Sequence, residues 1–172
     1  RPFEDNEGVT MRETLVAIGL VLAVAAAGSV ESAQAQQIKG RSQVTSGDTL
    51  FVGRQEVRLS GIDAPERDQY CENEFGRPFQ CGYQAMDALR EMVGRNDVVC
   101  LGEGTDESGR MIGTCYAGDI NLNTRMVRTG WALALTEERP DYAPLEQMAK
   151  REKAGIWGLK FENPAVWREQ NR

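Results

Sequence analysis

Acidic and basic residues stand close together in the segment VRLSGIDAPE, which runs from Val57 to Glu66. The apolar residues of this segment are typical of a buried strand, but Arg58, Asp63 and Glu66 interrupt that pattern. Ionised side chains are costly to bury without partners, so a strand that only packs into a core rarely contains them. The residue types therefore predict a site where carboxylates and a guanidinium do chemistry.

Two further patches of the same kind occur along the chain. Asp48 follows a glycine in SGDT, and Arg110 lies in DESGR near Asp106. Taken singly, each of these residues could belong to an ordinary turn, since Asp often hydrogen-bonds its own backbone there. Their combination with the first patch is what points to a functional site.

Together the patches contain the groups that water needs to attack a phosphodiester. Asp48 and Asp63 are predicted to bind one hard cation, which prefers carboxylate, carbonyl and water oxygens. Glu66 is predicted to orient or deprotonate the attacking water, while Arg58 and Arg110 bind the phosphate as bidentate donors. The cation and the arginines would stabilise the negative charge that develops on the phosphoryl oxygens.

This arrangement puts a condition on the strand that contains Arg58 and Asp63. The two residues are five positions apart, so an unbroken strand would point their side chains to opposite faces. A bend or bulge is required between them, and Gly61 is the predicted place.

Composition excludes several other kinds of chemistry. Histidine is absent from the 172 residues, which excludes a Ser-His-Asp triad, a histidine base and histidine-ligated zinc. The net charge is −6, and it becomes −3 without residues 1–35, which contain two of the 20 basic and five of the 26 acidic residues. A general polyanion-binding surface is not expected, so a nucleic acid partner would need local charge or a bound metal.

The N-terminal part has the form of a secretory signal. An apolar run at 15–28 is shorter than the ~20 residues that a membrane-spanning helix needs. Met11 and Arg12 precede the run, and AQA at 33–35 follows it as a cleavage site. We expect translation to start at Met11, cleavage after Ala35, and export to the periplasm or beyond without stable membrane association. The alternative is a signal anchor that stays uncleaved.

Four cysteines lie in the part that is expected to be exported, at Cys71, Cys81, Cys100 and Cys115. An even number in an oxidising compartment predicts two disulfides. Cys100 and Cys115 lie symmetrically about a predicted hairpin turn at 105–109, which favours Cys100–Cys115 and leaves Cys71–Cys81. A zinc site made of all four cysteines is the alternative, although the chain lacks a C-x2-C pair.

Periodicity and turn residues predict three strands, a helix, two strands and two more helices. Gly53 and Arg54 are expected to form a hairpin turn, and the helices are expected at 83–94, 121–130 and 144–155. Five strands with turn-rich junctions predict a small closed barrel of the OB type, with about three helices covering its open end.

The order and spacing of these motifs resemble a known family. SGDTL, VRLSGIDAPE, DESGRMIGTCY, NLN, MVRTGWALA and GIW follow one another from about Val44 to Trp157, as in the staphylococcal nuclease-like, or thermonuclease, family. The resemblance implies a five-stranded OB-fold barrel and calcium-dependent hydrolysis of DNA and RNA that leaves a 3′-phosphate. It also divides the expected mature chain into a nuclease-like domain at 36–162 and a C-terminal tail at 163–172.

Carried over by position, the resemblance implies a role for each site residue. These are the calcium carboxylates Asp48 and Asp63, the backbone carbonyl ligand Ala64, the water-activating Glu66 and the phosphate-binding Arg58 and Arg110.

The chain also departs from the family pattern. Ser46 stands where the family prototype has an additional Asp, so weaker calcium binding is expected. Glu107 and Ser108 replace a Lys-Tyr pair, and Thr136 stands near the place of a substrate-side tyrosine. These changes remove nucleotide contacts but leave the metal, water and arginine groups in place.

Two functions are compatible with these patterns. The favoured one is a secreted, monomeric, calcium-dependent nuclease, and the alternative is a catalytically inactive OB-fold module that binds nucleic acid or protein. The acidic residues favour the nuclease. Asp48, Asp63 and Glu66 would repel a polyanion unless a cation lay between them and it, and a module that only binds has no need of them.

Overall fold

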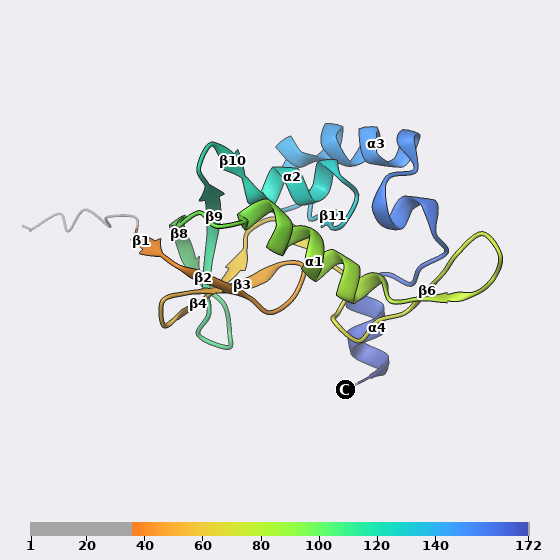
Figure 1. Cartoon of the computed structure of the whole chain (residues 1–172), viewed down its shortest axis with the longest axis horizontal. Coiled ribbons are helices and arrows are strands. Elements are labelled where there is room, and N and C mark those ends of the chain that lie inside the picture. Colours follow the sequence, from red (N-terminus) through yellow and green to blue (C-terminus); the bar gives the residue numbers. More distant parts are fainter. Residues whose placement is uncertain (1–35, 172) are drawn as a thin grey trace, which may run out of the picture. The chain divides into compact units, whose positions relative to one another are not determined.

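The structure is a computed structural model, and it describes residues 36–171 of the chain, so the predicted signal sequence at 1–35 lies outside the described residues. The described elements, drawn in Figure 1, are β1 (Gln37–Gly40), β2 (Ser42–Val44), β3 (Thr49–Val52), β4 (Gln55–Leu59), β5 (Ile62–Asp63), β6 (Cys71–Glu72), β7 (Pro78–Phe79), α1 (Cys81–Val93), β8 (Val98–Thr105), β9 (Met111–Ala117), β10 (Ile120–Asn121), α2 (Leu122–Arg128), β11 (Leu133–Ala134), η1 (Pro140–Tyr142), α3 (Ala143–Glu152), η2 (Gly155–Gly158) and α4 (Pro164–Gln170). Among the helices of this part, none is both long and apolar enough to cross a membrane.

The main sheet is mixed and has seven strands. Its strands pair in the order β1-β8-β9-β4-β3-β2, with β10 added to β9, and β4 runs parallel to β9. β1 and β2 stand at the two ends of this order, yet only Arg41 separates them in the chain, so the sheet curls back on itself. The turn pattern predicts a closed barrel. Within residues 36–171, however, no ladder joins β1 to β2, so the sheet is curled but not closed. With its helices it forms an α+β fold of the OB-like type.

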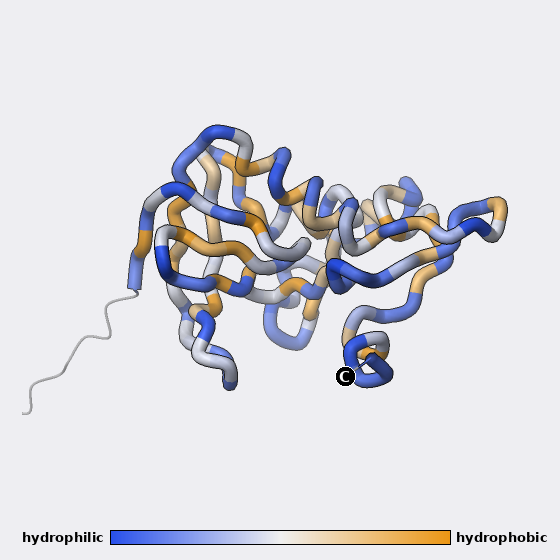
Figure 2. Tube along the Cα trace, turned by 60° about the horizontal axis from the view of Figure 1, so that its bottom comes forward, coloured by the Kyte–Doolittle hydropathy of each residue, from blue (hydrophilic) through white to orange (hydrophobic). Residues whose placement is uncertain are grey.

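The core lies between this curled sheet and helices α1 and α2. Leu50 of β3 and Val57 of β4 face each other across their ladder and are fully buried, as are Leu89 of α1 and Met126 of α2. Figure 2 shows hydrophobic stretches along these strands and helices, with hydrophilic residues in the connecting turns. Gly94 ends α1 with a φ of 57°, which confirms the predicted helix stop.

Both predicted disulfides are present, Cys71–Cys81 and Cys100–Cys115. Cys100 stands directly opposite Cys115 in the β8–β9 ladder, as the symmetry of the hairpin predicts. Cys71–Cys81 ties β6 to the first residue of α1. No free cysteine remains in the described residues, so the zinc alternative has no thiolate to use.

The C-terminal part differs most from expectation. Helix α3 ends at Glu152 and is capped by Lys153, which takes a left-handed φ of 52°, two residues before the predicted stop at Gly155. The predicted tail at 163–172 contains helix α4. Pro164 opens α4, and the side chain of Asn163 accepts a hydrogen bond from the backbone N–H two residues on, so the helix has an ordinary capped start.

Candidate active site

The bend required between Arg58 and Asp63 lies at Gly61. Strand β4 ends at Leu59, and Gly61 turns the chain with a φ of 71° before β5 begins. The Arg58 guanidinium donates a hydrogen bond across this turn to the backbone carbonyl of Ile62, 3.3 Å away. A side chain at Gly61 would meet Arg139, whose Cγ lies 2.2 Å from the position of a Cβ. The predicted bend and its place are therefore found in the structure.

A cavity of about 310 Å³, called here the carboxylate–arginine cavity, brings most of the predicted site together. Its lining is formed by Ser46, Asp48, Thr49, Arg58, Glu66, Arg110 and Arg168. Four of these are predicted catalytic or metal-binding residues: Arg58 lies in β4, and Asp48, Glu66 and Arg110 lie in connecting segments beside β3, β5 and β9. Arg168 comes from α4, which was not expected to take part.

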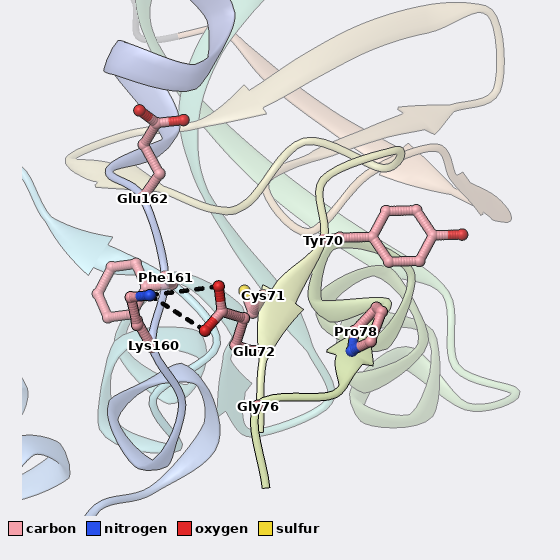
Figure 3. Close-up of a pocket in the computed structure, with 8 residues that line it drawn as sticks. All are labelled: Tyr70, Cys71, Glu72, Gly76, Pro78, Lys160, Phe161 and Glu162. Carbon is pink, nitrogen blue, oxygen red and sulfur yellow. Dashed lines mark hydrogen bonds and ion pairs between the residues drawn. The ribbon is translucent and has the colours of Figure 1, made fainter. Parts of the chain in front are cut away.

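A larger cavity, of about 650 Å³, lies beside the β6–β7 hairpin (Figure 3). Lys160 and Glu72 both line this cavity and form an ion pair with a distance of 3.1 Å. None of the predicted catalytic or metal-binding residues lines this cavity. The carboxylate–arginine cavity is therefore the candidate active site.

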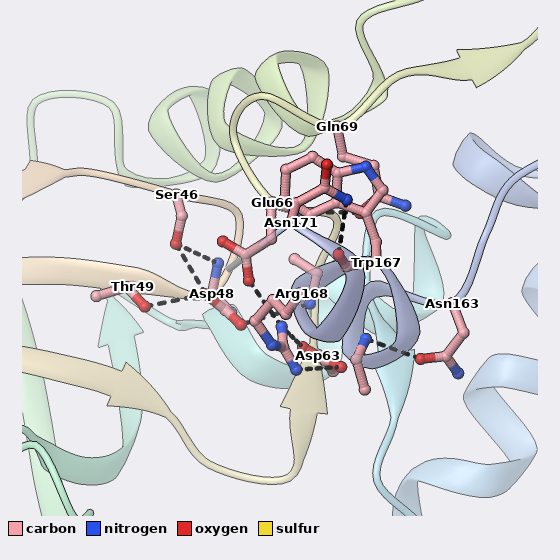
Figure 4. Close-up of polar contacts among 12 residues, drawn as sticks. Ser46, Asp48, Thr49, Asp63, Glu66, Gln69, Asn163, Trp167, Arg168 and Asn171 are labelled. Atoms are coloured by element: carbon pink, nitrogen blue, oxygen red, sulfur yellow. Dashed lines mark hydrogen bonds and ion pairs between the residues drawn. The ribbon is translucent and has the colours of Figure 1, made fainter.

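Asp48 is held in place by its neighbours in the SGDT turn (Figure 4). One carboxylate oxygen accepts hydrogen bonds from Ser46 Oγ at 2.8 Å and Thr49 Oγ1 at 2.9 Å. The other oxygen lies 3.5 Å from the backbone nitrogen of Ala64, the residue whose carbonyl is a predicted ligand. Ser46 stands where the family prototype has an additional Asp, and it supplies no carboxylate of its own. Its hydroxyl instead orients the carboxylate of Asp48.

Asp63 is paired with Arg168, a residue that sequence reasoning missed. Arg168 Nη1 lies 2.8 Å from Asp63 Oδ1, and Nη2 lies 3.0 Å from Oδ2. Nη1 also donates to Glu66 Oε1 at 2.7 Å. The hydrogen bond to Asp63, and after it the one to Glu66, raises the pKa of Arg168 above its ordinary value despite partial burial. This single guanidinium links the predicted calcium ligand to the predicted base.

Glu66 is positioned through its backbone. Its N–H donates to Gln69 Oε1 at 3.1 Å, while Gln69 Nε2 donates to the carbonyl of Glu162 at 2.7 Å. Gln69 is 1% exposed, so both of its bonds are shielded from water. Gly82 of α1 packs so closely that a Cβ there would lie 1.6 Å from the Glu66 carbonyl oxygen. Gln69 is a second residue that sequence reasoning missed.

Arg110 is oriented by the turn that contains it. Asp106 Oδ2 accepts a hydrogen bond from Arg110 Nε at 2.7 Å, and Oδ1 accepts from the backbone N–H groups of Ser108 and Arg110. Desolvation alone would raise the pKa of Asp106, but these bonds and the charge of Arg110 outweigh it and lower that pKa. Asp106 thus keeps its charge and holds the guanidinium toward the cavity.

The donor groups near Asp48 and Asp63 suit a hard cation. The two carboxylates are 8% and 3% exposed, and buried carboxylates need a positive partner. Carboxylates, the Ala64 carbonyl and the Ser46 hydroxyl are all oxygen ligands of the kind that Ca²⁺ prefers. Within residues 36–171 no three acidic, histidine or cysteine side chains are already gathered around one point, so backbone or water oxygens would complete such a site.

Comparisons with known proteins place the chain in a family. The family model described as "Staphylococcal nuclease homologue" matches residues 56–158. The "Succinoglycan biosynthesis protein ExoI" of Rhizobium meliloti (strain 1021) is 33% identical over 154 residues, which cover 88% of this chain and 80% of that protein. An "Uncharacterized endonuclease" of Escherichia coli O157:H7 is 32% identical over 136 residues, covering 74% and 82%. The "Probable staphylococcal-like nuclease CAN4" of Oryza sativa subsp. japonica is 29% identical, and the match spans only 24% of its length.

The matched segment contains Arg58, Asp63, Glu66 and Arg110, while Asp48 lies before it and Arg168 after it. It also contains the bend at Gly61, the β8–β9 hairpin and helices α1 to α3. Because the match covers more than half of the 172 residues, the chain belongs to the family of staphylococcal nuclease homologues.

Proposed function

We propose that this protein is an exported, calcium-dependent nuclease that hydrolyses phosphodiester bonds of DNA, RNA or both. One observation carries the proposal: Asp48, Arg58, Glu66 and Arg110 line a single cavity, although they come from separate parts of the chain. Family membership and relatives named as nucleases support the same class of activity. Export rests on the signal-like N-terminal sequence and is compatible with two disulfides in the described part.

Each residue of the cavity has a defined task in this reaction. Arg58 and Arg110 donate hydrogen bonds to the non-bridging phosphate oxygens and stabilise the charge that grows on them. Glu66 accepts a proton from the attacking water as the oxygen of that water bonds to phosphorus. The bond from phosphorus to the leaving oxygen breaks at the same centre, and solvent protonates the leaving group. Gln69 and Asp106 keep the base and one arginine in position.

Asp48, Asp63 and the Ala64 carbonyl are the groups that would hold calcium. When bound, calcium would supply a positive charge that polarises the phosphate and orients water beside it. The hydrogen bonds from Ser46 and Thr49 fix the orientation of the Asp48 carboxylate, one of these proposed ligands. Substrate binding would then depend on the arginines and the metal, since the net charge of the chain is negative.

An assay with purified protein tests the proposal. Single- and double-stranded DNA and RNA are incubated with calcium, with magnesium and with chelator. We expect cleavage with calcium and none with chelator. Arg128→Gln is a matched control, because it breaks a bidentate pair with Glu152 on the surface and should leave cleavage unchanged. A folded protein that binds single-stranded DNA with calcium present yet leaves it intact would instead indicate the binding-module alternative.

A further inference from the structure

Helix α4 reaches the carboxylate–arginine cavity with one long side chain. Figure 4 shows Arg168 extending from this helix toward Asp63 and Glu66. Its Nη1 donates hydrogen bonds to one oxygen of each acid, and its Nη2 donates one to the second oxygen of Asp63. Both oxygens of the predicted calcium ligand and one oxygen of the predicted base are therefore occupied by the same cation.

A bound calcium ion and this arginine compete for the same atoms. Calcium would need an oxygen of Asp63 at about 2.3–2.6 Å, while Arg168 contacts both oxygens at 2.8 and 3.0 Å. A divalent ion placed there would also stand beside a guanidinium whose charge is fixed, and like charges repel strongly at such a distance. The two cations therefore compete for Asp63 through their charges and through the oxygens that they share.

We propose that Arg168 is an internal counter-ion that occupies the calcium position, so that calcium must displace it before the protein can cut. This inference rests on the proposed function, because it assigns a regulatory residue to the same site. In the Arg168-bound state Glu66 is paired, so it is held away from its role as a base. Calcium binding then does two things at once: it fills the ligand position and frees Glu66.

The structure gives Arg168 a reason to bind and a route to leave. Asp63 is 3% exposed and would be costly to leave unpaired without a metal. The Arg168 side chain is 35% exposed, so it can withdraw into solvent. Helix α4 is otherwise lightly held, since Pro164 is its one buried residue among those described and Val166 is 43% exposed. The helix also lies beyond the segment that the family model matches.

Calcium binding measured by calorimetry, in the absence of substrate, tests this directly. Arg168→Gln should bind calcium more tightly than the parent, by roughly tenfold, within the range of ordinary coupling between sites. The control Arg128→Gln should bind like the parent, since it also loses a bidentate arginine–carboxylate pair, but one whose two residues do not line the cavity. In chelator, Arg168→Gln should melt at a lower temperature than the parent and gain more on calcium addition.

A second variant keeps the test valid if Arg168→Gln does not fold. Asn163→Ala removes the cap of α4, which should loosen the helix that holds Arg168, and replaces none of the residues that line the cavity. It should shift calcium affinity in the same direction by a smaller factor.

Activity at limiting calcium separates the possible roles. The proposal expects Arg168→Gln to cut faster than the parent at low calcium, with the difference narrowing as calcium rises. Unchanged calcium affinity overturns the proposal. Unchanged affinity with turnover lost at all calcium concentrations would make Arg168 a third phosphate-binding arginine. If the parent binds calcium but does not cut at saturation, the nuclease proposal fails, while the affinity comparison still decides the role of Arg168.

Discussion

The guanidinium of Arg58 and the backbone carbonyl of Ile62 are hydrogen-bonded at 3.3 Å, across the turn that separates β4 from β5. This bond joins the residue that enters the cavity to the strand that presents Asp63. It spans a turn at Gly61, whose φ lies in a region that other residues rarely adopt.

Gly61→Ala should therefore damage both stability and activity. Its Cβ would lie 2.2 Å from the Cγ of Arg139, and its backbone would be strained. We expect a loss of about 1–3 kcal/mol in the free energy of unfolding, measured by urea titration. Activity measured well below the melting temperature should fall as well. Gly53→Ala is a control, since it also has a positive φ but open space around it. Equal activity losses in both variants would contradict a special role for the bend.

Glu66→Gln should affect turnover more than binding. The amide keeps the shape of the side chain but cannot take a proton, so turnover should fall by about 10²–10⁴-fold, the usual range for a lost general base. Steady-state kinetics at saturating calcium measures the effect, and a binding titration with uncleaved single-stranded DNA checks affinity. Turnover within a few-fold of the parent would assign proton transfer to another group.

Asp63→Asn should weaken calcium binding. It should also weaken the pairing with Arg168, because the amide has no negative charge. We expect activity to need more calcium, with part of the rate recovered as calcium is raised, because Asp48 and backbone oxygens remain. Activity measured across a calcium series buffered with chelator tests this. Full activity in chelator would rule out calcium-assisted hydrolysis for this protein.

Asp106→Asn should act on Arg110 at a distance from the reacting atoms. The amide loses the charged bond to Arg110 Nε, so the guanidinium should be less well oriented and turnover should fall. The folded pKa of Asp106 is lowered, so its contribution to stability is present above the ordinary carboxyl value near 3.9 and is lost as the pH falls through the folded value. The variant should show less acid destabilisation in that range, measured as melting temperature against pH.

Removing Cys100–Cys115 should cost stability with little change in the chemistry of the cavity. A paired Cys100→Ala and Cys115→Ala variant should lose about 3 kcal/mol, from the entropy of a loop of this size. The sequence separation of this pair is 15 residues. Chemical denaturation measures the loss. Non-reducing peptide mapping of the parent should recover both disulfide-linked peptides, and any other pairing would contradict the β8–β9 register.

Local signals predicted a large part of this site. The turn at Gly61, the hairpin at Gly53 and the Cys100–Cys115 pair all depend on residues close in sequence or symmetric about a turn, so their geometry follows from local rules. Asp48 and Arg110 could each belong to an ordinary turn. They were predicted because they occur together with Arg58, Asp63 and Glu66, in an order that resembles the staphylococcal nuclease-like family.

The missed residues depend on contacts between distant segments. Arg168 meets Asp63 across 105 positions of sequence, and Gln69 meets the Glu162 carbonyl across 93. No periodicity links such residues. The one local signal was Asn163 followed by Pro164, a common start of a helix, which could have revealed α4 but not where Arg168 points.

The Cys71–Cys81 bond has a consequence for when the protein can work. It closes the loop that begins just after Glu66 and Gln69, and it fixes that loop to the start of α1, against which the Glu66 backbone packs. In a reducing environment this loop loses its covalent link to α1 and keeps only non-covalent contacts, among them the ion pair between Lys160 and Glu72, so the base should be less firmly placed. If the chain is exported as proposed, we expect it to be a poor catalyst before export, while its thiols are reduced, and to gain activity once the disulfide forms. The same bond that shapes the loop would thus spare the producer's own nucleic acids.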